Sequence, residues 1–169
     1  MNPIITNRLR LRKPQTQDAQ FYSEIENDSE VKKYIRGPTG KSKEQYRNSI
    51  EALPPDYRCL TIELLHSNTP IGRCGLITTE LESEIQIVLA KPYWRQGLGL
   101  EAGLALLELS AETFPDKKIV AKVHPQNAGS ISILQKIGMV CTGSVSSPEY
   151  DDGFLRFEKA AKAEAFLSE

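Results

Sequence analysis

The chain is poor in cysteine, histidine and tryptophan, with three, two and one of them among 169 residues. Cys59, Cys74 and Cys141 are odd in number and widely spaced, and each falls in a strand-like apolar run. We therefore expect three small buried hydrophobes instead of a disulfide framework or a zinc site. His66 and His124 are too isolated to indicate a metal site or nucleophilic catalysis, and we expect His124 to be a surface imidazole at a strand end.

Long apolar runs and an excess of one charge are also absent. No run approaches the roughly 20 residues that span a bilayer, and residues 1–8 do not resemble a signal peptide. We therefore expect a cytoplasmic protein with no membrane partner. The formal net charge of −1 gives no electrostatic reason to bind nucleic acid. Arg8, Arg10, Arg12 and Lys13 do cluster, and they are expected to form the solvated face of a strand.

The length and composition are those of an ordinary globular protein with one domain over residues 1–169. Apolar periodicity predicts a mixed α/β fold. Strands are expected at 4–13, 57–66, 70–78, 84–89, 118–124, 139–146 and 153–159. Helices are expected from Thr16 or Asp18, from Ser29, from Ser42 to before Pro54, from Leu98 to before Pro115, and from Asn127 to Gly138.

The stretch from 84 to 115 organises the chain as a strand, a glycine-bearing loop and a long apolar helix. Ile85, Ile87 and Leu89 alternate onto one face of the strand. Two adjacent apolar stripes follow helical spacing, one through Leu100, Leu104, Leu107 and Ala111, the other through Leu98, Ala102, Ala105 and Leu109. Glycine inside a helix costs roughly 1 kcal/mol relative to alanine. Gly103 therefore predicts a close approach of this helix to the sheet.

The loop before that helix carries Gly97 and Gly99. The first N–H groups of a helix lack intrahelical acceptors and carry the positive end of the helix dipole, so this loop can bind a phosphate or pyrophosphate. From the spacing alone, the glycines equally well only shape a turn. Residues 97–102 also fit a G-x-G-x-x-G/A dinucleotide fingerprint, although seven residues intervene between Leu89 and Gly97, where a tight turn is required.

Residues 84–102, EIQIVLAKPYWRQGLGLEA, resemble the acetyl-CoA-binding core of the GNAT N-acetyltransferases. They are most similar to the branch that acetylates ribosomal-protein N-termini. The resemblance extends to TNRLRLR at 6–12, NAGS at 127–130 and LQKIGM at 134–139. It implies a curved, mostly antiparallel sheet flanked by helices. The implied reaction moves acetyl directly from acetyl-CoA to a primary amine, either a protein N-terminus or a small amine, in a monomer or homodimer without a metal.

The resemblance also implies roles for individual residues. Glu84 is the expected base that deprotonates the amine, and Ser130 the expected acid that protonates the departing thiolate. Asn127 is expected to contact the pantetheine arm. Without the resemblance, Glu84 indicates only a solvated strand end, and Asn127 an N-cap that accepts from the Ser130 N–H.

The remaining cofactor contacts follow from the same match. Those expected at the pyrophosphate are Arg95, Gln96, Gly97, Gly99 and Leu100. Backbone groups of Val88 and Leu89 match the strand edge that pairs with pantetheine and polarises the thioester carbonyl. The helices before residue 54 are expected to wall the acceptor pocket.

One departure leaves the acceptor open. After Glu-Ile the ribosomal branch often carries Gly-Tyr-Trp, whereas this chain has Gln86, Ile87 and Val88. A non-catalytic acyl-CoA-binding module therefore remains an alternative, because such a module keeps the glycine loop and does not need Glu84.

Overall fold

The computed structural model of the chain describes residues 2–54, 58–147 and 150–159. The strands are β1 (Ile4–Ile5), β2 (Leu9–Arg12), β3 (Cys59–Leu64), β4 (Thr69–Thr78), β5 (Glu82–Leu89), β6 (Lys118–Val123), β7 (Met139–Ser147) and β8 (Tyr150–Lys159). The helices are α1 (Ala19–Asn27), α2 (Lys43–Glu51), α3 (Leu98–Thr113) and α4 (Ala128–Lys136), with 3-10 turns η1 (Thr16–Asp18) and η2 (Lys91–Tyr93).

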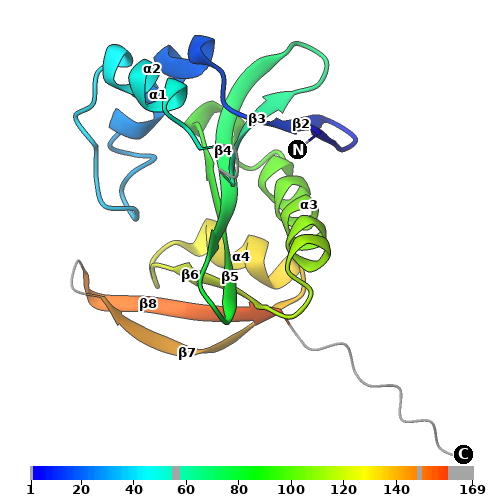
Figure 1. Ribbon diagram of the computed structural model, residues 1–169. Coiled ribbons are helices and arrows are strands. Elements are labelled where there is room, and N and C mark those ends of the chain that lie inside the picture. Colours follow the sequence, from blue (N-terminus) through cyan, green and yellow to red (C-terminus); the bar gives the residue numbers. More distant parts are fainter. Residues whose placement is uncertain (1, 55–57, 148–149, 160–169) are drawn as a thin grey trace, which may run out of the picture.

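The described strands form one sheet in the order β1-β2-β3-β4-β5-β6-β8-β7. Within it only β5 and β6 run parallel. Helices α1 and α2 lie on one side of the sheet and α3 on the other (Figure 1). The expected mixed, mostly antiparallel fold flanked by helices is confirmed. The single domain over 1–169 stays a prediction, since residues 160–169 lie outside the described part.

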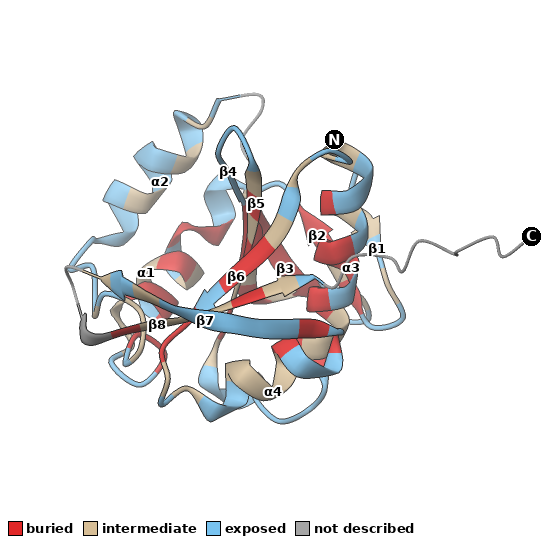
Figure 2. Cartoon of the chain, turned by 90° about the horizontal axis from the view of Figure 1, so that it is seen from below, coloured by how far each residue is buried: buried red, intermediate tan, exposed pale blue. Residues whose placement is uncertain are grey.

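Helix α3 supplies much of the core. Leu98, Ala102 and Leu106 are at most 3% exposed, and buried positions gather on α3 and the central strands, whereas α2 is largely exposed (Figure 2). A Cβ at Gly103 would lie 3.5 Å from Ile87 of β5 and 3.3 Å from Ile137 after α4. Gly103 therefore permits the predicted close approach.

The first of the two predicted stripes on α3 is partly wrong. Leu104 is 47% exposed and Ala111 is also exposed, while Leu106, which neither stripe contained, is fully buried. The helix is apolar around most of its circumference, so spacing alone did not distinguish the buried face from its neighbours.

Two local predictions failed near the N-terminus. The strand expected at 4–13 is split into β1 and β2 by a turn in which the Thr6 N–H donates to the Leu9 carbonyl at 2.9 Å. The helix expected from Ser29 is a run of turns. The Asp28 carboxylate caps the first turn by accepting from two successive backbone N–H groups. After one α-type bond, from the Lys32 N–H to the Asp28 carbonyl, the described bonds to Glu30 and Lys32 carbonyls span only three residues, so the turns do not continue as an α-helix.

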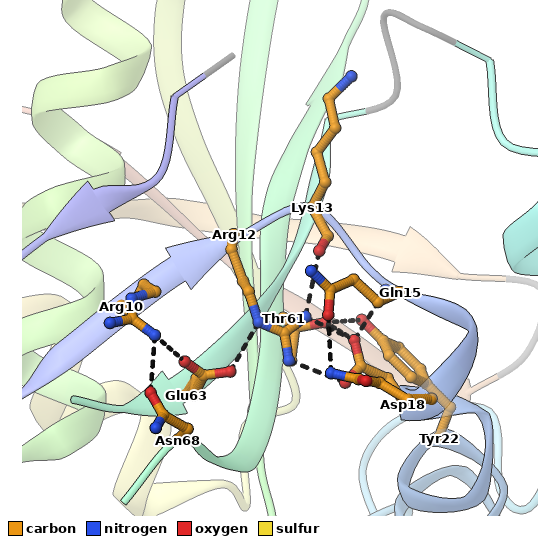
Figure 3. A network of polar contacts seen from close by, with 10 residues as sticks. Arg10, Arg12, Lys13, Gln15, Asp18, Tyr22, Thr61, Glu63 and Asn68 are labelled. Atoms are coloured by element: carbon orange, nitrogen blue, oxygen red, sulfur yellow. Dashed lines mark hydrogen bonds and ion pairs between the residues drawn. The ribbon is translucent and has the colours of Figure 1, made fainter. Parts of the chain in front are cut away.

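The basic cluster of the first strands is not simply a solvated face. Arg12 is 8% exposed. Its guanidinium donates to Asp18 at 2.7 and 2.9 Å and to Glu63 at 2.6 Å, and Arg10 also donates to Glu63 (Figure 3). Burial pushes the pKa of Asp18 up, but the hydrogen bonds and charge of Arg12 outweigh it and hold this pKa below its ordinary value. The network balances two cations against two carboxylates.

The cysteine prediction holds at one position. Cys74 is 1% exposed, and burial raises the pKa of its thiol. Cys59 is half-buried, and Cys141 is exposed on β7, contrary to expectation. Strand β7 is an edge strand that pairs only with β8 in the described sheet, and most of its residues are exposed.

Candidate active site

The parallel strands β5 and β6 separate partway along their length. They pair only from Glu82 opposite Lys118 to Glu84 opposite Val120. Strand β5 continues to Leu89 beside β4, while β6 continues beside β8. Among the described residues, the β6-facing edge of β5 beyond Glu84 has no strand partner. A backbone edge of this kind accepts an extended, amide-containing ligand as if it were another strand.

The glycine loop lies where β5 leads into α3. Arg95 and Gly97 have φ angles of 58° and 77°, so the chain reverses twice before α3 begins at Leu98. Neither Gly99 nor Leu100 has a described acceptor for its backbone N–H, and the same is true of Leu98. These groups, at the positive end of a 16-residue helix, suit a pyrophosphate.

A residue from the other end of the domain fixes this loop. Arg8 donates from Nη1 to the Gln96 carbonyl at 2.9 Å and from Nε to Glu101 at 2.7 Å. Glu101 also accepts from the Arg8 N–H and from the Thr6 hydroxyl. This contact was not predicted from the sequence, because the residues that it joins are 88 to 95 positions apart.

Trp94 restricts one of the predicted cofactor contacts. Its indole N–H donates to the Leu89 carbonyl at 2.7 Å. That carbonyl already accepts one hydrogen bond, which leaves it one lone pair. The backbone groups of Val88 face β4, as the Ala90 N–H does in bonding Ile71, so edge pairing must use Ile87 and the Leu89 N–H, and the prediction for Val88 does not fit the strand register. The side chain of Gln96 is likewise engaged, because it donates to the Pro92 carbonyl at 2.8 Å.

Glu84 lies where β5 and β6 begin to separate. Its Oε2 atom is 2.7 Å from Lys122 Nζ on β6, and its Oε1 atom accepts from Gln86 at 3.2 Å. The side chain is 16% exposed. Each carboxylate oxygen thus already accepts one hydrogen bond, and an amine or a water must use a remaining lone pair or replace one of these contacts.

The start of α4 has the predicted cap. Asn127 Oδ1 accepts from the Ser130 N–H at 3.1 Å. The Ser130 hydroxyl is half-buried and makes no hydrogen bond to any described residue. A Cβ at Gly99 would lie 2.8 Å from Ile133, so the first turn of α3, directly after the glycine loop, packs against the second turn of α4. The expected loop and α4 residues are therefore neighbours.

Glu84 lies on the other face. Ile85 and Ile87, which alternate with it, face α3, so its side chain extends toward the α1 side. No described contact links Glu84 with Ser130. If Glu84 and Ser130 act on the same acetyl group from opposite faces of the sheet, that group must lie in the space where β5 and β6 separate.

Turns at 29–36 cross that region on the α1 side. Val31 packs with Val88 of β5, and the Tyr34 ring stacks on His124 at the end of β6, with the centroids 5.1 Å apart. His124 is 8% exposed and also contacts the Phe154 ring. The expectation of a surface imidazole was therefore wrong. Its burial comes from two segments distant in sequence.

A pocket of about 240 Å³ opens between α1, α2, β3 and β4. It is lined by Pro14, Tyr22, Glu26, Lys41, Tyr46, Ser49, Ile50, Leu53, Cys59 and Arg73. Arg73 stands opposite Val88 in the β4–β5 register, so the pocket lies beside the far end of the unpaired β5 edge. Sequence analysis placed the early helices here but did not identify Arg73.

Other kinds of site have less support. Residues 2–54, 58–147 and 150–159 contain no group of three or more His, Cys, Asp or Glu side chains placed to hold a metal ion. Across the same ranges, none of the helices combines the length and apolarity that crossing a bilayer requires. Strands β5 and β6 with α3 form one βαβ unit, but they pair at only three positions and the strands on either side run antiparallel. A dinucleotide site lies instead in a mostly parallel sheet.

Comparison with known proteins identifies the family. Residues 8–140 match the sequence profile of the acetyltransferase (GNAT) domain. The uncharacterized N-acetyltransferase p20 of Bacillus licheniformis is 28% identical over 163 residues, 92% of each chain. A GNAT-family acetyltransferase from Bacillus anthracis has a TM-score of 0.79 at 25% identity, covering 93% of this chain and 96% of that one.

The ribosomal-protein-S5-alanine acetyltransferase from Vibrio fischeri shares the fold, with a TM-score of 0.78 at 15% identity over 94% of this chain and 96% of that one. The predicted resemblance to the GNAT family is confirmed, and the ribosomal-protein acetyltransferase shares its fold, while the ribosomal-type branch stays a prediction. The dinucleotide hypothesis is no longer tenable, because the matched profile includes the glycine loop and its flanking strand and helix. The chain belongs to the GNAT family of acetyltransferases.

Proposed function

We propose that this protein transfers the acetyl group of acetyl-CoA to a primary amine by direct attack, without a covalent enzyme intermediate. The observation that carries the proposal is the combination of an unpaired β5 edge with acceptor-free N–H groups at Leu98, Gly99 and Leu100. The unpaired edge suits the amide-containing pantetheine arm, and the N–H groups suit the pyrophosphate. The two features follow one another along the chain, as the arm and the pyrophosphate do in acetyl-CoA.

Acetyl-CoA supplies the activated acetyl group, and the chain positions it and moves protons. The N–H groups around Gly97 and Gly99, with Arg95, Gln96 and Leu100, hold the pyrophosphate. The Leu89 N–H, which faces the open edge of β5, orients the arm and donates toward the acetyl oxygen.

Protons move at two side chains. Glu84 accepts the amine proton, directly or through one water, at a remaining lone pair or in place of its contact with Lys122 or Gln86. Ser130, whose hydroxyl has no described partner, donates a proton to the leaving sulfur, while Asn127 caps α4 and contacts the arm.

The test separates binding from chemistry at Glu84. Glu84→Gln should lower kcat by about 10²- to 10⁴-fold, the usual contribution of a general base. Its thermal stabilisation by acetyl-CoA should stay that of the wild type, about 2.7 kcal/mol at 100 times the dissociation constant. Glu80→Gln, an exposed glutamate in the adjacent turn, is the matched control and should change neither property.

A second candidate function is a non-catalytic acyl-CoA-binding module. The engagement of both Glu84 oxygens by Lys122 and Gln86 favours it. Stabilisation by acetyl-CoA with no turnover of any amine in the wild-type protein would establish this alternative. Full turnover by Glu84→Gln would instead remove only the base assignment.

A further inference from the structure

Three charged side chains beside the pocket carry a net positive charge. Glu26 of α1 accepts from Arg73 Nε through one carboxylate oxygen and lies 2.7 Å from Lys32 Nζ through the other. The side chains of Glu26, Arg73 and Lys32 are 6%, 18% and 4% exposed. Two cations therefore share one carboxylate, whereas the neighbouring Arg12 network pairs its charges evenly (Figure 3).

The excess positive charge persists at neutral pH. Burial opposes the charged form of Glu26, yet the hydrogen bonds and charges of Arg73 and Lys32 outweigh burial and lower the pKa of Glu26. Burial likewise opposes the charged form of Arg73, and its bond to Glu26 keeps the pKa of the guanidinium above its ordinary value. Poorly solvated, uncompensated charge is costly, so this site stabilises an anion.

The free donors of Arg73 face the pocket. Its Nε atom is the only one of its nitrogens that donates to a described residue. Every fully buried side-chain nitrogen or oxygen in the described part has a partner, so the two Nη atoms reach accessible space. Arg73 lines the pocket, as does Lys41, whose Nζ lies 5.8 Å from the Tyr46 ring.

The position of Arg73 connects the pocket to the acetyl site. Arg73 and Val88 are directly opposed on β4 and β5, which places their Cα atoms about 5 Å apart. Directly opposed residues project their side chains from the same face, so Arg73 and Val88 both extend to the α1 side, toward which Glu84 also extends. An anion on the Nη atoms therefore lies on the same face of the sheet as the proposed base.

We propose that the acceptor is a small amine that also carries a carboxylate, which the Nη atoms of Arg73 bind with help from Lys41. The proposal rests on the acetyltransferase function proposed above and names its substrate class. A planar guanidinium with two free nitrogens matches a carboxylate in a bidentate manner. A polyamine would instead bring a second positive charge to a site that already has an excess of one.

The test compares amino acids with their carboxamides as acetyl acceptors. Glycine, β-alanine and γ-aminobutyrate vary the distance between the amine and the carboxylate, while each carboxamide keeps the amine and loses the charge. The preferred acid should exceed its amide in kcat/KM by roughly 10- to 100-fold, the value of a charge-assisted hydrogen bond. Aminoethylphosphonate and spermidine complete the series as a phosphonate and a cation.

Variants assign the preference to the pocket. Arg73→Gln should bring the acid-to-amide ratio close to one without weakening stabilisation by acetyl-CoA. Arg73→Lys, which keeps the charge but not the planar donors, should retain part of the ratio. Arg47→Gln is the matched control, since Arg47 is 52% exposed on α2 and pairs only with Glu51 in the described part. It should leave the ratio unchanged.

Each outcome bears on one proposal. Three results would overturn the carboxylate assignment and leave the acetyltransferase proposal in place. The wild type could use acids and amides equally, it could prefer spermidine or the phosphonate, or Arg73→Gln could lose the same activity on both substrates. If no amine is acetylated although acetyl-CoA stabilises the protein, the proposed function fails. Calorimetry with the same acids then tests whether the pocket binds a carboxylate. The wild-type protein should bind the preferred acid, and the Arg73→Gln variant should not.

Discussion

The two faces of the sheet are built by different physical means. On the α3 side, apolar side chains and two glycines bring helices α3 and α4 against β5, and the glycine loop there is formed within seven consecutive residues. On the α1 side, charged residues from separate elements form networks at distances near 2.7 Å. The proposed acetyl-CoA site thus depends on local backbone geometry, and the proposed acceptor pocket on long-range charge pairing.

The largest expected effect tests the charge networks. Arg12→Ala leaves Asp18 and Glu63, whose side chains are 2% and 4% exposed, without their main cation. It should reduce the free energy of unfolding by about 3–5 kcal/mol, as for a broken buried ion pair. Arg8→Ala, at a side chain 44% exposed on the α3 side, should cost about 1 kcal/mol or less. Urea denaturation measures the free energy of unfolding of each variant. Equal losses in the two variants would contradict the proposed difference between the two faces of the sheet.

Glycines give a second comparison. A Cβ at Gly72 of β4 would collide with the Val88 carbonyl, which is backbone and cannot move aside. Gly72→Ala should therefore destabilise the fold by about 1–3 kcal/mol. At Gly103 the nearest atom is the end of the Ile137 side chain at 3.3 Å, and alanine restores roughly 1 kcal/mol of helix propensity. Gly103→Ala should thus be nearly neutral. Thermal unfolding of the two variants checks this difference. A similar loss of stability in both would contradict the distinction between the backbone contact at Gly72 and the side-chain contact at Gly103.

Acid should weaken the charged face first. The pKa of Asp18 is lowered in the folded protein, because the hydrogen bonds and charge of Arg12 outweigh the opposing effect of burial. This contribution is complete above the unfolded pKa of about 3.9 and is lost as pH falls through the folded value. Below about pH 4 the unfolding free energy of Asp18→Asn should therefore depend less steeply on pH than that of the wild type, by up to one proton. Parallel pH profiles would contradict the assignment.

Two matched helix caps give the smallest effects. Ser42 accepts from the Gln45 N–H at the start of α2, and Asn127 accepts from the Ser130 N–H at the start of α4. Each change to alanine should cost about 1 kcal/mol. Only Asn127→Ala should also raise the KM for acetyl-CoA, since only α4 adjoins the glycine loop. A rise in the KM for acetyl-CoA in Ser42→Ala would contradict the proposal that acetyl-CoA binds beside α4 and not beside α2.

Sequence reasoning succeeded where the determinants are local. The caps at Ser42 and Asn127, the glycine after α4 and the loop at Gly97 each follow from a few adjacent residues. It failed for the helix expected from Ser29. The apolar spacing there is helical, yet the bonds after the first turn span only three residues, and the backbone leaves the helical region at Arg36 and Gly37, where φ is 47° and 68°.

Long-range contacts were beyond local patterns. Arg73 and Glu26 are 47 positions apart, and Lys122 and Glu84 are 38 apart. Such pairs depend on strand register, which a single sequence specifies only through the hydrophobic alternation of each strand. The family resemblance predicted Glu84 as a base but contained no information about the lysine that holds it.

The tie between the N-terminal hairpin and α3 has a consequence for synthesis of the chain. Glu101 receives its three hydrogen bonds from Thr6 and Arg8, so the first residues to leave the ribosome await a partner made more than ninety residues later. At about 5–20 residues per second, this delay is roughly 5–20 seconds. The glycine loop before α3 is thus held in place by the oldest part of the nascent chain, and this contact forms only after the strands between them have been made.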